Sequence, residues 1–463
     1  MKRKILPILL IITIAILGIT AATPQSDTIN TIGSLMEIIK EDYYKDIDDE
    51  TLIRGAIDGM FKSLDPHSTY MDPKEFKELN EFTSGEFSGI GVSIERKDDR
   101  ITVVSPIEGT PAHEAGLNTG DIIISVDDTD IKDYALDKAA ALIRGETGTK
   151  VKLGVIKADT QNTIYIELTR TIIEIESVKY ETPYGRKAEV EIKDKSIGYI
   201  RLTEFNEHTY RDFKKSIDKY KEENKTGLII DIRNNPGGLL DSVVNVCKLI
   251  IPEGPIVHID AKGTKNDETY SSELKKPPFK LAILINGGSA SASEILAGAV
   301  KDSKIGITVG TKTYGKGTVQ NIMQLTNGGG VKLTIAEYMT RNKINIDGKG
   351  IEPDIKVEPM NPQNNLITLN IDRDIKNDTI GLDVYSIQQR LINLGSDIVL
   401  DGIMGKRTLK AVNELLQENN LPAVSYLNKD TQQKIIELYN KNIVDKIKDN
   451  QLEAAIKELQ KIL

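Results

Sequence analysis

Apolar residues recur at helical spacing in the first part of the chain. Two stripes of apolar side chains, three or four positions apart, predict helices within residues 27–84. Pro66 ends the second stripe, because a proline disfavours helix at the residue before it. We expect this helical region to cap the domain that follows. The stripes comprise Ile29, Ile32, Leu35, Met36 and Ile39, and then Leu52, Ile53, Ala56, Ile57, Met60 and Phe61.

The pattern changes to short strands over residues 85–170. Two short helical segments, Pro111–Leu117 and Leu136–Arg144, lie between apolar runs of strand length. This mixture predicts a compact, partly open barrel. The expected strands are Ile101–Val104, Gly120–Val126, Val151–Ile156 and Ile164–Leu168.

Strands and helices alternate in residues 196–357, which predicts an α/β core within residues 171–357. The run Leu228–Ile232 is apolar throughout, as expected of a strand buried on both faces of a sheet. The other expected strands are Ile197–Leu202, Leu281–Ile285 and Ile305–Val309, and the expected helices are Arg211–Glu223, Asp241–Ile250 and Ala292–Lys301.

Three further segments follow this core. Residues 358–380 are polar and are expected to form a linker. Residues 381–440 predict a small helical unit, and residues 441–463 predict one amphipathic helix. The length of 463 residues agrees with such a multi-domain protein.

The composition excludes several classes of function. A net charge of −9 argues against a nucleic-acid-binding protein, which would need a basic face. A single cysteine, Cys247, rules out an intrachain disulfide and a metal site built from cysteines. The four histidines are scattered along the chain, so we expect no metal centre and no cofactor.

The N-terminus carries a targeting pattern within residues 1–22. Three basic residues precede an apolar run from Ile5 to Ala22, which is typical of a secretory signal peptide. The run is also long enough for an uncleaved membrane anchor, so both alternatives stay open. A buried core helix is the third interpretation. Either of the first two predicts an exported, extracytoplasmic protein.

One glycine-rich segment is similar to a phosphate-binding loop. Gly310–Gly317 follows an apolar strand and nearly matches the G-x-x-x-x-G-K-[ST] pattern. The match fails at Gly317, where the magnesium-binding hydroxyl would stand. The residues after it predict a strand rather than the helix that would hold the phosphate. A nucleotidase is therefore not indicated.

A second segment offers a candidate nucleophile. Asn286–Glu294 is rich in serine and joins a strand to a helix, where backbone N–H groups favour negative charge. Helix capping is the alternative reason for serine at such a junction. The turn Asp231–Gly238 also follows a strand and exposes backbone amides. The chain lacks the G-x-S-x-G motif of α/β-hydrolases.

The serine would need a base. No histidine lies near these segments in sequence, and a lysine in a dry pocket is the other known solution. Lys316 lies between two glycines and is the candidate, although most lysines in glycine-rich hairpins are simply solvated.

These motifs together resemble the carboxy-terminal processing proteases, the tail-specific serine peptidases of family S41 that carry a PDZ domain. The resemblance extends over nearly the whole chain, and its motifs occur in the family's order. They are Ala56–Met60, Ser63–Ser68, Ser88–Val92, Ser105–Pro106, Gly109–Ala112, Gly116–Leu117, Gly120–Asp121, Asp231–Gly238, Ser289–Glu294, Tyr314–Gln320 and Gly350–Asp354.

The resemblance implies a core of the ClpP/crotonase type and assigns catalytic roles. It makes Ser291 the nucleophile, Lys316 the general base and Gln320 the residue that orients the lysine. The oxyanion hole would use the amide of Ala292 and that of Gly237 or Gly238, and the choice between the glycines stays open.

The resemblance also assigns residues 85–170 to a PDZ domain inserted into the protease. Ser88, Gly89, Ile90, Gly91 and Val92 would bind the C-terminal carboxylate of an extended peptide. The expected partners are therefore proteins or peptides with free C-termini. Arg144 is the candidate for coupling this domain to the active site, and a surface arginine at a helix end is the alternative. Helical parts of relatives mediate dimerisation, so a homodimer is also expected.

Residues 381–440 resemble a peptidoglycan-binding domain with three helices, and an unrelated helical bundle is the alternative. The matching residues are Tyr385–Leu391, Leu394–Gly395, Asp401–Gly405, Thr408 and Ala411–Val412. Such a domain would tether the protein to the cell wall.

The sequence thus predicts an exported serine endopeptidase with a Ser–Lys dyad and an acyl-enzyme intermediate. Its substrates would be recognised near their C-termini by the PDZ domain. We expect it to be associated with the cell wall or anchored to the cytoplasmic membrane. The alternative is a catalytically silent PDZ scaffold tethered to the cell wall.

Overall fold

The computed structural model describes residues 24–97, 99–184, 186–263, 267–359, 366, 369, 371, 373–443 and 448–463. The expected signal peptide or anchor, residues 1–22, lies outside these ranges. Among the described helices, none is both long and apolar enough to cross a membrane. The chain divides into two compact units: Met1–Pro73 with Gln320–Thr334, and Lys74–Val319 with Ile335–Leu463.

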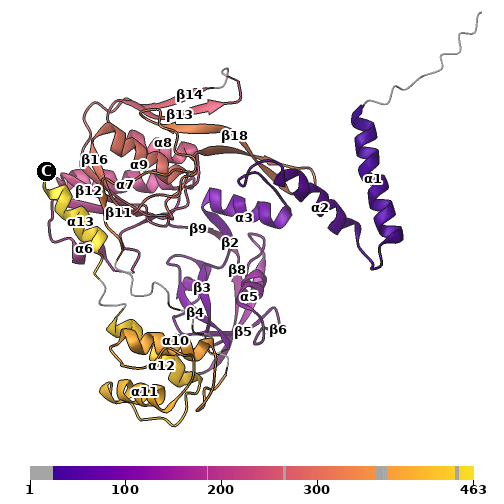
Figure 1. The fold of residues 1–463 in the computed structure, drawn as a ribbon, viewed down its shortest axis with the longest axis vertical. Coiled ribbons are helices and arrows are strands. Elements are labelled where there is room, and N and C mark those ends of the chain that lie inside the picture. The colour runs from indigo at the N-terminus through magenta and orange to yellow at the C-terminus, as the bar shows by residue number, and fades with distance from the viewer. Residues whose placement is uncertain are drawn as a thin grey trace, which may run out of the picture. The chain divides into compact units, whose positions relative to one another are not determined.

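The first unit contains the two helices expected from the apolar stripes, α1 (Pro24–Asp42) and α2 (Asp49–Lys62) (Figure 1). Asp48 caps α2, because its carboxylate accepts the N–H of Thr51 at 2.6 Å. Strand β1 (Thr69–Met71) pairs antiparallel with the first residues of β18 (Gly330–Thr340). Most of β17 (Thr318–Gln324) also belongs to this unit.

A mixed sheet forms the centre of the second unit. Its strand order is β10-β11-β12-β15-β16-β19, and all pairs are parallel except β10 with β11. The four central strands lie where the apolar runs predict them. The bounds are β10 Val178–Lys179, β11 Ile197–Leu202, β12 Gly227–Asp231, β15 Lys280–Ile285, β16 Gly306–Gly310 and β19 Ile355–Lys356.

One face of this sheet is covered by the three helices that the alternating pattern predicts. They are α7 (Thr209–Glu222), α8 (Leu240–Lys248) and α9 (Ala292–Ser303). An additional short helix, α6 (Ala188–Glu191), packs through Ala188 on the other face. Because side chains alternate along a strand, Ile230 and Ile283 pack with the three helices, whereas Ile229 and Ala282 face the other way. The cluster with the three helices forms the larger core.

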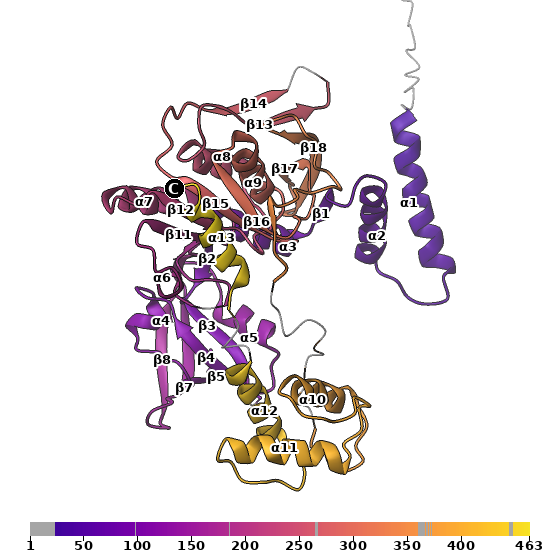
Figure 2. The ribbon, with the colours of Figure 1, turned by 60° about the vertical axis from the view of Figure 1, so that its left-hand side comes forward.

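The opposite face is covered by α13 (Asn450–Gln460), near the end of the chain (Figure 2). Leu452, Ala455 and Leu459 recur at helical spacing and are completely buried against the sheet. The single helix predicted over 441–463 is wrong, because α12 (Lys429–Asn442) continues to Asn442 and α13 is a separate helix. Asp449 caps α13 by accepting the N–H of Leu452 at 3.0 Å.

A second, antiparallel sheet lies beside this core and was missed in the sequence. Strand β13 (Gly254–Ala261) pairs with β14 (Glu268–Ser272) on one side and with the later residues of β18 on the other. Its strands mix half-buried and exposed positions, so their apolar pattern is weak.

Residues 85–170 form a compact β-domain with its own apolar core. Its sheet has the order β3-β4-β5-β7-β8, with β6 paired to β5, and the expected helices are α4 (Pro111–Glu114) and α5 (Leu136–Ile143). A two-stranded ribbon of β2 (Glu86–Gly89) and β9 (Thr171–Glu174) joins the domain to the core, and α3 (Pro73–Ser84) precedes it. The strands are β3 Val92–Lys97, β4 Arg100–Pro106, β5 Ile122–Val126, β6 Thr129–Asp130, β7 Lys150–Ile156 and β8 Thr163–Thr169.

Helices also dominate the segment between β19 and α13. There α10 (Leu382–Asn393), α11 (Lys406–Glu418) and α12 enclose a separate apolar cluster that includes Ile387, Val412 and Ile435. The side chains facing this cluster recur at helical spacing.

Candidate active site

Ser291 lies at the junction between β15 and α9. The parallel strands of the sheet end at this edge, which is where α/β sheets place their sites. The backbone of Ser291 has φ 55° and ψ −116°, a conformation that residues with a side chain rarely adopt. Such strain costs about 1–3 kcal/mol and persists where surrounding contacts enforce it, often at functional sites.

The neighbouring serines, Ser289 and Ser293, have structural roles, because their hydroxyls form hydrogen bonds with the backbone. Ser289 Oγ donates to the carbonyl of Ile232 at 2.7 Å, and Ser293 Oγ donates to the carbonyl of Asn235 at 2.9 Å. Both side chains are completely buried, whereas Ser291 is half-buried. They therefore bind the serine segment to the turn after β12.

That turn carries the two glycines predicted for an oxyanion hole. The N–H of Gly237 donates to Asn235 Oδ1 at 2.9 Å. A Cβ atom on Gly237 would lie 2.9 Å from Ser291 Cβ and 3.0 Å from the amide nitrogen of Ala292, so only glycine fits against the serine. At Gly238, φ is 140° and a Cβ atom would lie 2.2 Å from the carbonyl oxygen of Phe205.

Glu294 joins the serine segment to the lysine segment. Its Oε2 accepts the backbone N–H of Ser291 and of Lys316, each at 2.9 Å. Its Oε1 accepts Thr313 Oγ1 at 2.6 Å and the N–H of Gly315 at 2.7 Å. Burial raises the pKa of Glu294, while these hydrogen bonds act in the opposite direction.

No catalytic or structural role was predicted for Glu294 from the sequence. The available signal was its position three residues after Ser291, the spacing at which a glutamate in the first helical turn bonds back to the capping residue.

Tyr338 connects the same two segments from β18. Its hydroxyl lies 3.1 Å from the carbonyl oxygen of Ser291 and 2.7 Å from that of Lys316. Burial raises the pKa of the Tyr338 hydroxyl well above its usual value, so the group stays a hydrogen-bond donor. No sequence pattern pointed to this tyrosine.

The predicted lysine and glutamine belong to different units. Lys316 is half-buried in the second unit, between glycines that pack closely on the chain around Asp347 and Gly350. Gln320 belongs to the first unit, where its Nε2 donates to Thr334 Oγ1 at 3.2 Å. The orienting contact between Gln320 and Lys316 stays a prediction.

A groove of about 390 Å³ lies between α5 and the segment that enters the β-domain. It is lined by four of the five predicted peptide-binding residues, Gly89, Ile90, Gly91 and Val92. Ser88 does not line it, and its hydroxyl lies 2.9 Å from Thr147 Oγ1. The remaining lining residues are mostly apolar: Phe87, Ile94, Leu136, Asp137, Ala140, Ile143 and Arg144.

Arg144 lies at the end of this groove. Its guanidinium stacks 5.2 Å from the centre of the Phe87 ring and lies 3.5 Å from a carboxylate oxygen of Glu81 in α3. It therefore connects the groove to the helix before the β-domain.

One group of side chains has the composition of a metal site. The ligand atoms of Glu86, Glu174 and His208 lie within 4.8 Å of one another. However, His208 Nε2 lies 2.9 Å from Glu86, and Arg211 donates to Glu174 at 2.6 Å. Since a guanidinium already neutralises one carboxylate, ion pairing between the ribbon and α7 explains this group.

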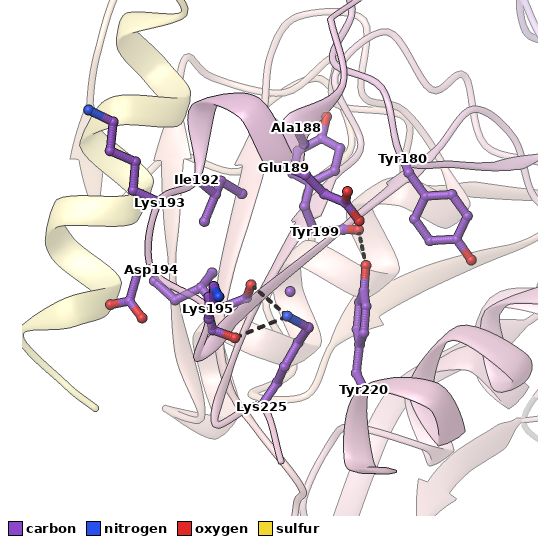
Figure 3. Close-up of a pocket in the computed structure, with 12 residues that line it drawn as sticks. Tyr180, Ala188, Glu189, Ile192, Lys193, Asp194, Lys195, Tyr199, Tyr220 and Lys225 are labelled. Atoms are coloured by element: carbon purple, nitrogen blue, oxygen red, sulfur yellow. Dashed lines mark hydrogen bonds between the residues drawn. The ribbon is translucent and has the colours of Figure 1, made fainter. Parts of the chain in front are cut away.

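Another pocket lies where β11 begins (Figure 3). Lys225 Nζ donates to two backbone carbonyls beside it, and the hydroxyl of Tyr220 donates to the carbonyl of Tyr199 at 2.8 Å. Strands β11 and β15 run in the same direction. The pocket lies where β11 begins, whereas Ser291 follows the end of β15, so the two lie at opposite ends of the strands.

Comparison with known protein families matches three segments. Residues 196–357 match Peptidase family S41, and residues 88–168 match the PDZ domain. Residues 19–75 match the activating protease CtpB N-terminal domain.

Two relatives come from Bacillus subtilis. The chain is 35% identical to the carboxy-terminal processing protease CtpA, over 96% of this chain and 93% of that protein. It is 32% identical to the carboxy-terminal processing protease CtpB, over 95% of this chain and 91% of that protein. Among solved structures, the photosystem II D1 C-terminal processing protease is 30% identical, with a TM-score of 0.40 over 70% of this chain and 86% of that one.

The family match covers the segments that carry Ser291 and Lys316, and the two relatives match almost the entire chain. The chain therefore belongs to the S41 family of carboxy-terminal processing proteases with a PDZ domain, and it is a serine-type endopeptidase.

Proposed function

We propose that the enzyme cleaves proteins by a Ser291–Lys316 dyad. The observation that carries this proposal is the pair of contacts from Glu294 and Tyr338, which hold the backbones of both residues in one arrangement. The strained backbone of Ser291 supports the same assignment.

In this mechanism, Ser291 Oγ forms a bond to the carbonyl carbon of the scissile peptide, and its proton passes to the neutral amine of Lys316. The carbonyl oxygen becomes an oxyanion, which backbone N–H groups stabilise. Collapse breaks the C–N bond and transfers the proton from Lys316 to the leaving amine. Water then attacks the acyl carbon while Lys316 accepts a proton from it, and the ester bond to Ser291 Oγ breaks as Lys316 returns this proton to the serine.

For the oxyanion hole, we assign the amides of Ala292 and Gly238. The N–H of Gly237 is engaged by Asn235, which leaves Gly238 as the donor of this glycine pair. Gln320 would orient the amine of Lys316, as the resemblance implies.

We also propose that the groove beside α5 binds the C-terminus of the substrate. Its apolar lining suits small or apolar terminal side chains, and the amides around Gly89–Gly91 would hold the carboxylate of an added strand. Arg144 would couple occupancy of the groove to the active site, through its contact with Glu81.

The remaining assignments come from the sequence. Residues 381–440 would bind peptidoglycan, the N-terminal run would direct export or anchor the chain in the membrane, and a core of the ClpP/crotonase type is expected. The N-terminal helices would form a homodimer, since apolar side chains of α1 such as Leu35 and Ile38 are exposed.

The proposal is tested with one peptide that ends in apolar residues, prepared with a free or an amidated C-terminus. The wild-type protein should cleave the free form faster, while Ser291→Ala and Lys316→Arg should be inactive because they lack the nucleophile and a base that can lose its proton. Activity should rise with pH as Lys316 loses its proton. Cleavage by Ser291→Ala at the wild-type rate would refute the dyad.

A further inference from the structure

A buried ion pair connects the turn after β12 to the helix near the end of the chain. The guanidinium of Arg233 donates from Nη1 to Asp449 Oδ1 at 2.9 Å and from Nη2 to Asp449 Oδ2 at 2.7 Å. A third acceptor, Gln451 Oε1, lies 3.0 Å from Nη1. The side chains of Arg233 and Asp449 are only 3% and 1% exposed, so water cannot replace these partners.

The other side of the guanidinium is fixed to the strand. Arg233 Nε donates to Asp231 Oδ1 at 3.0 Å, and the same oxygen accepts the backbone N–H of Arg233. Tyr199 donates to the second oxygen of Asp231 at 2.8 Å. The backbone of Arg233 therefore follows the position of its own side chain.

Arg233 is the residue from which the proposed oxyanion turn begins. The N–H of Asn235 donates to the carbonyl of Ile232, and Asn235 Oδ1 accepts Gly237 N–H at 2.9 Å. These hydrogen bonds connect successive residues of a short turn. A displacement of the backbone of Arg233 should therefore also displace the amide of Gly238.

The helix side of the pair is anchored independently. Gln451 Nε2 donates to the carbonyl of Val357 at 2.8 Å, and Leu452 and Leu459 are completely buried against the sheet. A bidentate carboxylate on a fixed helix holds a guanidinium in one orientation. Arg233 Nη2 also donates to Asp231 Oδ2 at 2.5 Å, so loss of the carboxylate of Asp449 leaves the charge paired but removes the second of the two acids that fix the guanidinium.

We propose that Asp449 is a positioning residue for peptide hydrolysis, because through Arg233 it fixes the turn that supplies the oxyanion donor. This inference rests on the proposed function. It places the final helix within the catalytic unit, although α13 follows the segment assigned to cell-wall binding.

The test compares Asp449→Asn with a control on the same helix. Asparagine retains an oxygen that can cap α13, but it places an amide N–H where the second carboxylate oxygen accepts Arg233 Nη2. Leu459→Ala weakens the packing of α13 next to Gly227, far along the helix from Arg233. Both variants should unfold at a lower temperature. Kinetics are measured in full-length proteins at a temperature where both are folded.

Asp449→Asn should lower kcat about ten- to a hundredfold with little change in KM, because misplacement of a transition-state donor affects the chemical step. Leu459→Ala should retain the wild-type kcat. Gln451→Ala removes only one acceptor of Arg233 and should lower kcat by a smaller factor. If Asp449→Asn does not fold, the kcat of Gln451→Ala decides the test.

A kcat within twofold of wild type for folded Asp449→Asn, or for Gln451→Ala when Asp449→Asn is unfolded, would overturn the inference. An equal loss of kcat in Leu459→Ala would also overturn it, because general weakening of α13 would then explain the effect. A Ser291→Ala protein is assayed in parallel. Equal rates for wild type and Ser291→Ala would instead refute the proposed function, so the two failures are distinguishable.

Discussion

The carboxylate of Glu294 accepts the backbone N–H of Lys316 at 2.9 Å. The same carboxylate accepts three further hydrogen bonds, one of them from the N–H of Ser291. A single buried side chain thus fixes the distance between the segments of the proposed dyad. Glu294 therefore has a structural role between the two segments, since all four of these hydrogen bonds come from the chain around them.

Glu294→Gln should therefore reduce kcat by at least tenfold. The amide nitrogen would face donors that now point at an oxygen, leaving buried N–H or O–H groups unpaired at a cost of about 1–3 kcal/mol each. The measurement combines peptide hydrolysis with thermal unfolding. Glu273→Gln, an exposed change of the same kind, is the control and should behave as wild type. Unchanged kcat in folded Glu294→Gln would contradict this role.

Ser293→Ala should lose stability and part of its activity. The hydroxyl of Ser293 donates to the carbonyl of Asn235, which also accepts the N–H of Ala290, so its removal takes away one of two hydrogen bonds and costs about 0.5–1.5 kcal/mol. The turn that holds Gly238 would also be loosened, and we expect kcat to fall several-fold. By contrast, Ser291→Ala should retain stability and lose all activity. Urea unfolding and hydrolysis rates distinguish the two, and equal activities would show that the middle serine is not the nucleophile.

Asp354 should contribute stability that depends on pH. Burial opposes its ionisation, but hydrogen bonds from Lys301 and Thr308 lower the pKa of Asp354 overall. A lowered folded pKa means that the contribution is present above the unfolded value near 3.8 and is lost as the pH falls through the folded value.

Asp354→Asn should consequently lower the free energy of unfolding at pH 7 by about 1–2 kcal/mol, a value reduced because the carboxylate is partly exposed. The difference from wild type should shrink as urea unfolding is repeated at successively lower pH, below 4. Glu352→Gln, at an exposed ion pair with Lys312, is the control and should show little effect. A difference that is constant with pH would show that ionisation of Asp354 is not responsible.

Removing the segment between the linker and α13 should abolish binding to peptidoglycan and preserve proteolysis. Asn450 Nδ2 donates to the carbonyl of Glu358 at 2.8 Å, so the two ends of this segment meet at the core. A short glycine–serine bridge in place of residues 361–446 should therefore leave the core intact. Sedimentation with purified peptidoglycan and peptide hydrolysis are measured on the same protein. Equal sedimentation by the shortened and full-length proteins would refute the proposed binding domain.

The strands of the α/β core could be predicted because each is a short apolar run bounded by polar turns. The segments of Ser291 and Lys316 were also identifiable, since glycine and serine cluster there in a family order. The identity of Glu294 as their common acceptor depends on two loops meeting in space, and only its spacing from Ser291 gave a local signal.

The position of α13 could not be predicted for a related reason. Its apolar stripe indicates that one face is buried, but not which surface covers it. Arg233 and Asp449 are separated by 216 residues, and an arginine in a turn or an aspartate before a helix is too common to indicate a buried pair. In the structure α13 begins after Asp449, which caps it. The amphipathic pattern continues without a break from residue 441, so this start could not be recognised in the sequence.

The position of α13 has a consequence for the order in which the protein assembles. During synthesis, α13 emerges after the other described elements of the core, so the sheet has an uncovered apolar face until that moment. Arg233 also lacks its partner on the helix during this interval. We expect chains that end before Asn450 to be inactive and sensitive to added proteases, even though they contain both residues of the proposed dyad. If Asp449 positions the turn as proposed, a chain still being synthesised would be unable to cut its neighbours until α13 has docked on the sheet.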